Sequence, residues 1–253
     1  MQSLEIFGPI WIFAIFAVLF AAFIRGLAGF GFALILAPVL LLILSPAAVV
    51  VINLFLGLLS NIVVVLHSFA RIDFKRVLPM ALSSLLGIPL GVWIISVVAP
   101  PILKIFIGVV IVCFAVLVAF GFRKTFAGER MSSGVAGFFS GILSSSTSLG
   151  GPPVVLFMHS QDWPKDIIHP SLAGYFLFLG SCSLGALSLS GQVTTETIIT
   201  AASLAPALLA GTGLGIVVFH RVNARFFRGF SVAIVICAGL LGIISGVGLF
   251  PSF

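Results

Sequence analysis

Charged residues are scarce in this sequence. Of the 253 residues, 7% are Asp, Glu, Lys or Arg, against roughly 25% in a typical soluble domain, and 61% are hydrophobic. This composition excludes an ordinary soluble domain. It predicts an all-α integral membrane protein, in which each spanning helix needs about 20 mostly apolar residues.

Cysteine and the common catalytic motifs are also rare or missing. Cys113, Cys182 and Cys237 stand singly inside apolar runs, which argues against a disulfide framework or a metal site. No phosphate-binding GxxxxGK[ST] is present, so ATP hydrolysis by this chain is not expected. The sequence shows no nucleophile–base pair that would indicate an enzyme. We therefore expect no enzymatic activity, no cofactor and no metal.

Carboxylates are missing from every predicted span. The six acidic residues fall in loops or at span ends: Glu5, Asp73, Glu129, Asp162, Asp166 and Glu196. A cation carrier or a carboxylate proton relay would normally place one at membrane depth. The net charge of +6 does not indicate nucleic-acid binding, because basic residues of a membrane protein first set its orientation. An anion is the favoured solute.

The apolar runs form two similar series. Each has one broken segment (7–44 and 134–160) followed by three uninterrupted runs, which are 48–68, 77–97 and 101–120, then 169–189, 197–218 and 229–250. The order predicts a first repeat at 7–120, a linker at 121–133 and a second repeat at 134–250.

Residues within the broken segments also match. GLAGFGFALILAP begins at Gly26 and GILSSSTSLGGPP begins at Gly141, so that Gly26 pairs with Gly141 and Pro38 with Pro153. Because such pairings keep their order along the chain, they indicate an internal duplication.

Loop charges predict that the two repeats are inverted. The loop at 71–76 has three basic residues, whereas its counterpart at 190–196 has none. The turn at 97–101 is uncharged, whereas its counterpart at 219–228 is basic. Positive loops face the cytoplasm. We therefore expect a cytoplasmic linker, non-cytoplasmic termini and broken segments that re-enter without crossing, although 7–44 is also long enough for two crossings.

The two breaks are the predicted site, because interrupted helices at matching positions of two halves mark the binding sites of transporters. Glycines permit close backbone approach, and prolines end or restart helices. The residues expected to form or gate the breaks are Gly26, Pro38, Gly141, Gly150, Gly151, Pro152 and Pro153.

Donor groups near the breaks predict an anion site. The side chains and glycines expected to bind substrate are Arg25, Gly29, Gly31, Asn53, Asn61, Ser144, Ser145, Ser146, Thr147, Ser171 and Tyr175. Arg25 is the only charge inside either break, and guanidinium suits oxyanions. Two alternatives stay open: Arg25 can snorkel to the interface, and small residues can serve helix packing. His67, His159 and His169 are either interfacial residues or proton-coupling groups.

At these residues the chain resembles the TauE/SafE (TSUP) family of sulfite exporters. The resemblance rests on GLAGFGFALILAP from Gly26 and GFFSGILSSSTSLGGPPVV from Gly137, and it extends over essentially the whole chain. It implies a multi-pass carrier of the bacterial inner membrane for sulfite, sulfonates such as sulfoacetate, or related organosulfur anions. The second motif departs from the family in its run of hydroxyl residues, which leaves the particular anion open.

The expected function is therefore a secondary transporter that exports such an anion by alternating access at the two breaks. The alternatives are an anion channel of the same fold or an importer of another small anion. The expected partners are the anion and the lipid bilayer, with a homo-oligomer as an option and no nucleic acid.

Overall fold

The computed structural model describes residues 9–28, 31–119, 128–161 and 163–219, together with 236, 239 and 240. Within these ranges every regular element is helical. All but three residues of the predicted run at 229–250, and residues 121–127 of the predicted linker, lie outside the described residues.

The described helices form two series that begin alike. The first series is α1 (Pro9–Ala28), α2 (Phe32–Leu40), α3 (Pro46–Ser68), the 3₁₀ helix η1 (Phe69–Arg71), α4 (Phe74–Val97) and α5 (Pro100–Ala119). The second is α6 (Glu129–Thr147), α7 (Gly151–Ser160), α8 (Lys165–Leu189) and α9 (Thr195–Phe219). A long helix and a short helix thus precede the remaining long helices in both series.

Five helices of the described ranges are long and apolar enough to cross a membrane: α3, α4, α5, α8 and α9. Since a helix rises about 1.5 Å per residue, 20 residues match the roughly 30 Å of a bilayer's hydrocarbon core. The prediction of an all-α, multi-pass membrane protein is confirmed.

Local sequence explains two sharp helix starts. The Ser45 hydroxyl accepts a hydrogen bond from the Ala48 amide at 3.4 Å, and Pro46 is the first residue of α3. The Asp73 carboxylate accepts from the Arg76 amide at 3.2 Å at the start of α4. Side-chain caps of this kind satisfy amides that have no partner within the helix.

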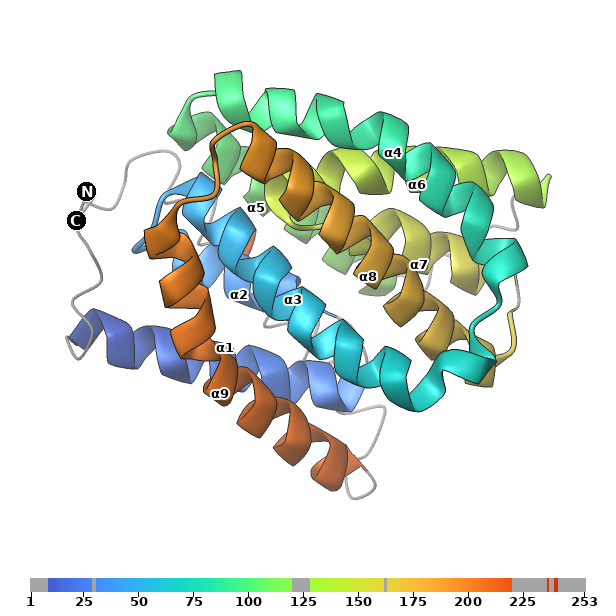
Figure 1. The fold of residues 1–253 in the computed structure, drawn as a ribbon, viewed down its shortest axis with the longest axis horizontal. Helices are drawn as coiled ribbons and strands as arrows, with labels where there is room; N and C mark the ends of the chain where they lie inside the picture. Colours follow the sequence, from blue (N-terminus) through green and yellow to red (C-terminus); the bar gives the residue numbers. More distant parts are fainter. Residues whose placement is uncertain are drawn as a thin grey trace.

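Helices of the two series pack in exchanged pairs (Figure 1). α3 and α8 run side by side through the centre, α4 lies along α6 on one flank, and α9 crosses and packs against α1 on the other. Each flank therefore combines one helix from each series.

Glycines bring the flanking helices into backbone contact. A Cβ atom on Gly87 of α4 would overlap the Phe138 carbonyl oxygen of α6. A Cβ on Gly211 of α9 would likewise overlap the Leu19 carbonyl oxygen of α1. The next glycines four residues along, Gly91 and Gly215, make equivalent approaches, so both flanks use the small-residue packing common in membranes.

Contacts at the helix ends distinguish the two ends of the bundle. The Asp73 amide donates to the Ser171 hydroxyl at 3.1 Å, which places the α3–α4 loop beside the start of α8. The Gln192 amide group donates to the Ser96 hydroxyl at 3.4 Å, beside the end of α8. The loops at 71–76 and 190–196 thus lie at opposite ends of α8.

Arg76 contacts both ends of the second broken segment. Its Nε lies 3.9 Å from Glu129 Oε1 at the start of α6, and its guanidinium lies 5.2 Å from the centre of the Trp163 ring, beyond α7. The α6–α7 segment therefore leaves one end of the bundle and returns to the same end.

Candidate functional site

The second break lies between α6 and α7. Ser148 ends α6 in the left-handed conformation with φ 61°, and it is the only non-glycine residue with positive φ among those described. The Ser140 hydroxyl donates to the Gly150 carbonyl at 2.5 Å and holds the start of α7 against the middle of α6. Ser140 stands roughly 16 Å along α6 from Glu129, about half a bilayer's hydrocarbon thickness.

The first break lies between α1 and α2. Gly31 precedes α2 with φ 94°, and a Cβ there would meet nothing within 4 Å. Its backbone conformation, rather than crowding, favours glycine at this position. Gly29, the other predicted glycine of this link, lies outside the described residues.

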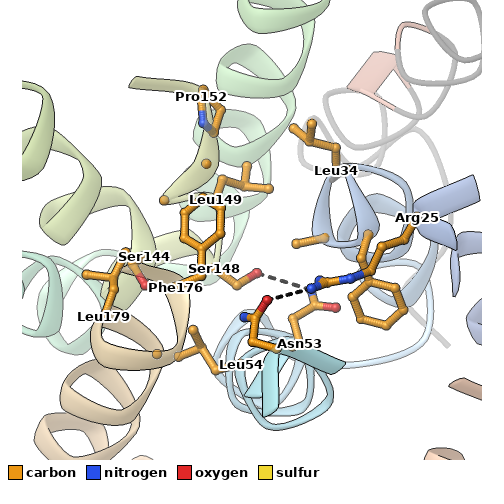
Figure 2. A pocket seen from close by; sticks show the side chains of 18 of the residues that line it. Arg25, Leu34, Asn53, Leu54, Ser144, Ser148, Leu149, Pro152, Phe176 and Leu179 are labelled. Carbon is orange, nitrogen blue, oxygen red and sulfur yellow. Dashed lines mark hydrogen bonds between the residues drawn. The ribbon is translucent and has the colours of Figure 1, made fainter. Parts of the chain in front are cut away.

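A cavity of about 100 Å³ separates the two breaks (Figure 2). This volume exceeds the roughly 10–15 Å³ that one water molecule needs. Its polar side chains are Arg25, Asn53, Asn61, Ser144 and Ser148. Its apolar side chains include Leu54, Leu58, Phe114, Phe176 and Leu179.

Arg25 supplies the cavity's charge. Among the described lining residues it is the only charged side chain, and its Nη2 donates to Asn61 Oδ1 at 2.6 Å. Asn61 is 4% exposed and comes from α3, so this bond joins α1 to the central helices. Within the described part of the chain no carboxylate pairs with Arg25.

Asn53 and Ser148 connect α3 to the second break. Asn53 Nδ2 donates to Ser148 Oγ at 3.1 Å, and Ser148 Oγ donates to the Thr147 carbonyl at 2.5 Å. Asn53 Oδ1 is buried without a hydrogen-bond partner. On the other side of the break, Ser183 of α8 donates to Ser144 at 3.0 Å.

Both short helices present their first turns to the cavity. Residues 31–34 of the α2 start and 150–152 of the α7 start line it. The first amides of a helix lack partners within the helix, and the helix dipole makes this end favourable for anions. Pro152 has no N–H, so the start of α7 offers fewer donors than that of α2.

Three residues of the predicted hydroxyl run do not line this cavity. Ser145, Ser146 and Thr147 are helical, and their hydroxyls donate to carbonyls four residues earlier, on Gly141, Ile142 and Leu143. Ser145 also donates to the Ile88 carbonyl of α4 at 2.9 Å. Their hydroxyls are thus engaged in the helix and at its contact with α4.

Two predicted residues of α8 lie elsewhere too. Ser171 accepts from the Asp73 amide near the end of the bundle, and Tyr175 is fully buried. Neither lines the cavity.

The predicted break residues divide between the cavity and helix packing. Gly150, Gly151 and Pro152 line the cavity. The other four lie within helices: Gly26 in α1, Pro38 in α2, Gly141 in α6 and Pro153 in α7. A Cβ on Gly141 would overlap the Ser84 carbonyl oxygen, which gives that glycine a role in packing against α4.

Of the predicted histidines, His67 and His169 do not line the cavity. His67 is exposed, with its Nδ1 2.8 Å from the Val63 carbonyl oxygen, and His169 is exposed on α8. His159 belongs to α7, and its side chain lies outside the described residues. In the described part of the chain, no three His, Cys, Asp or Glu residues form a cluster that could hold a metal ion.

Sequence reasoning did not name Gly57 or Phe176 as site residues, although both line the cavity. A signal for Gly57 exists, because Asn53, Gly57 and Asn61 are spaced by four and so share one face of α3. Phe176 carries no such signal, since one phenylalanine among 26 is not distinctive.

Comparison with known proteins gives one family. The model of the family described as "Sulfite exporter TauE/SafE" matches residues 14–242. Searches of curated proteins and of solved structures found no match.

Proposed function

Since the chain belongs to the TauE/SafE sulfite exporter family, we propose that it is a secondary transporter of small sulfur-containing anions. It exports sulfite or sulfonates such as sulfoacetate across the bacterial inner membrane. The observation that carries this proposal is the cavity between the breaks, where Arg25 is the only charged side chain among the described lining residues.

The charge balance of the cavity favours an anion. A cation away from water is costly unless an opposite charge compensates it, and the described residues give Arg25 only the neutral oxygen of Asn61. Guanidinium presents several N–H groups in a planar fork that matches an oxyanion. A bound sulfite or sulfonate supplies the missing negative charge.

Backbone amides and apolar walls complement Arg25. The first turn of α2 borders the cavity, so its free amides can donate to a second oxygen of the anion. Phe114, Phe176 and Leu179 line this space with apolar surface, which lowers the local dielectric. Electrostatic attraction is stronger in such surroundings than in water.

The exchanged helix pairs support alternating access. Backbone contacts at glycines join α4 to α6 and α1 to α9, so each flank is suited to move as one body. The cavity is lined from α1 on one side and from α6 on the other. Relative rocking of the flanks would open it first to one side of the membrane and then to the other.

Opposite placement of equivalent loops supports inverted repeats. The loop at 71–76 is basic and lies at the other end of α8 from the loop at 190–196. The basic end faces the cytoplasm by the positive-inside rule. In a negative-inside cell, export of an anion is then favoured by about 2.3 kcal/mol per charge per 100 mV.

Replacement of Arg25 tests this function. In titration calorimetry on the purified full chain, Arg25→Gln should weaken sulfite binding at least about thirtyfold, the scale for removing one partner of a desolvated charge pair. Proteoliposomes of the unaltered protein should show saturable sulfite flux with counterflow. Flux without saturation or counterflow would instead identify an anion channel.

Arg71→Gln is the matched control, because it removes the same charge from an exposed position at the end of the bundle. Its sulfite affinity should equal that of the unaltered protein. Unchanged affinity in Arg25→Gln would contradict the proposed site.

A further inference from the structure

The direction of the hydrogen bond between Arg25 and Asn61 follows from the chemistry of the two side chains. Arginine is a donor only, so the Asn61 atom that lies 2.6 Å from Nη2 is the amide oxygen. The distance is short for an N–H···O bond, as expected when the donor is charged. Asn61 therefore presents to Arg25 the kind of atom that an oxyanion would present.

The same guanidinium nitrogen is needed for bidentate binding. A planar guanidinium offers its N–H groups as a fork of two parallel donors, and Nη2 belongs to both of its forks. Asn61 Oδ1 uses one of the two Nη2 hydrogens. An anion that takes the fork containing this hydrogen must displace the amide oxygen, whereas the other fork uses the second Nη2 hydrogen.

From this contact we propose that Asn61 Oδ1 is a stand-in acceptor, which binds Arg25 in the empty site and is displaced when an oxyanion binds. Asn61 thereby determines substrate affinity. The inference rests on the proposed function of the cavity. Exchange of a neutral oxygen for a charged one is favourable, so the anion wins the competition. The exchange also breaks the bond between α1 and α3, which links binding to release of the α1–α9 flank.

Competition within the empty site lowers apparent affinity. When only a fraction of the protein is competent to bind, the apparent Kd rises in inverse proportion to that fraction. Removal of the Asn61 oxygen should free Arg25 and tighten binding, although it also removes a stabilising bond from the empty protein. Stability and affinity should thus change in opposite directions.

Asn61→Leu and Asn61→Asp test the inference, with sulfite as the ligand and the full chain in detergent. Asn61→Leu should melt at a lower temperature without ligand and bind sulfite about tenfold more tightly, the scale of one hydrogen bond to a charged group. Asn61→Asp should melt higher without ligand and lose sulfite binding, because its carboxylate pairs permanently with Arg25.

Ser60→Ala is the control, since it alters the neighbouring buried residue of α3, which does not line the cavity. It should leave sulfite affinity unchanged. Weaker or unchanged binding in Asn61→Leu would overturn the inference, and if Arg25→Gln still abolished binding, the proposed function would stand. If Asn61→Leu failed to fold, wild-type affinity in Asn61→Asp would overturn the inference.

Discussion

Ser148 is held in an unusual backbone conformation by contacts from two sides. Its φ of 61° is unfavourable for a residue with a Cβ atom. Its hydroxyl accepts from Asn53 and donates to the Thr147 carbonyl, and these bonds stabilise the turn between α6 and α7. Serine at this position therefore has a strained backbone, but its hydroxyl makes hydrogen bonds that glycine cannot make.

Two substitutions separate these effects. Ser148→Ala removes the hydroxyl and keeps the strain, whereas Ser148→Gly removes both. The glycine variant should therefore be more stable than the alanine variant by about 1 kcal/mol, the cost of a left-handed Cβ-bearing residue. Unfolding by denaturing detergent would measure this difference. A glycine variant no more stable than alanine would show that strain at this position is negligible.

The sequence predicted individual cavity residues where their residue type is rare within the apolar runs. Arg25, Asn53 and Asn61 are uncommon groups in apolar runs, and all three line the cavity. The hydroxyl run was a poorer guide. Ser and Thr hydroxyls can satisfy themselves on carbonyls of the preceding turn, as Ser146 and Thr147 do, so their number does not reveal whether the helix is broken.

Among the elements, α4 and α6 depend on each other most directly. Gly87 and Gly91 face the carbonyl oxygens of Phe138 and Ile142 so closely that a Cβ atom would overlap them. Backbone atoms cannot turn aside as a flexible side chain can. The close crossing of α4 and α6 therefore requires glycine at both positions.

Gly87→Ala should destabilise the protein by about 3 kcal/mol, the upper end for an overpacked core, because the obstacle is backbone. Gly185→Ala is the matched control, since a Cβ at this exposed position of α8 meets nothing within 4 Å. It should be neutral or stabilise by up to about 1 kcal/mol. Equal stability of the two variants would argue against a tight α4–α6 contact.

The sequence predicted which segments are helical, but it did not predict which side of each helix faces the cavity. Apolar runs gave the spans because a bilayer demands them. Ser171 and Tyr175 share a face of α8, yet neither of them lines the cavity. In a helix that is apolar on most sides, lipid and protein faces differ little in hydrophobicity, so sequence does not fix the direction of a given face.

Contacts within the two flanks suggest a different residue pairing between the predicted repeats. Gly215 of α9 approaches Gly26, whereas its counterpart Gly91 of α4 approaches Ser145. If α4 and α9 are equivalent elements of the two predicted repeats, these contacts pair Gly26 with Ser145 instead of Gly141. Both residues are small, and a sequence comparison between degenerate motifs cannot resolve a shift of one helical turn.

At the scale of the whole molecule, the described loops at the two ends of α8 differ in charge. Arg76 contacts Asp73, Glu129 and Trp163 at one end, so that the α3–α4 loop and both ends of the α6–α7 segment meet there. The described loop at the other end of α8 has no basic residue. The first end should face the cytoplasm.

Cysteine labelling can test this orientation. With Cys113, Cys182 and Cys237 replaced, Arg71→Cys should react with an impermeant maleimide only after the membrane is opened, whereas Gln192→Cys should react in intact cells. The reason is that the two positions lie at opposite ends of α8. Labelling of both from one side would contradict inverted repeats.

The exchanged pairing of α1 with α9 also constrains how the protein is made. Leu19 contacts Gly211, so a helix that leaves the ribosome near the beginning of synthesis finds its partner near the end. At about 5–20 residues per second, the interval is roughly 10–40 s. During that time the partner-facing surface of α1 must be covered by lipid or by an assembly factor. A chain that stops before α9 would never complete this flank.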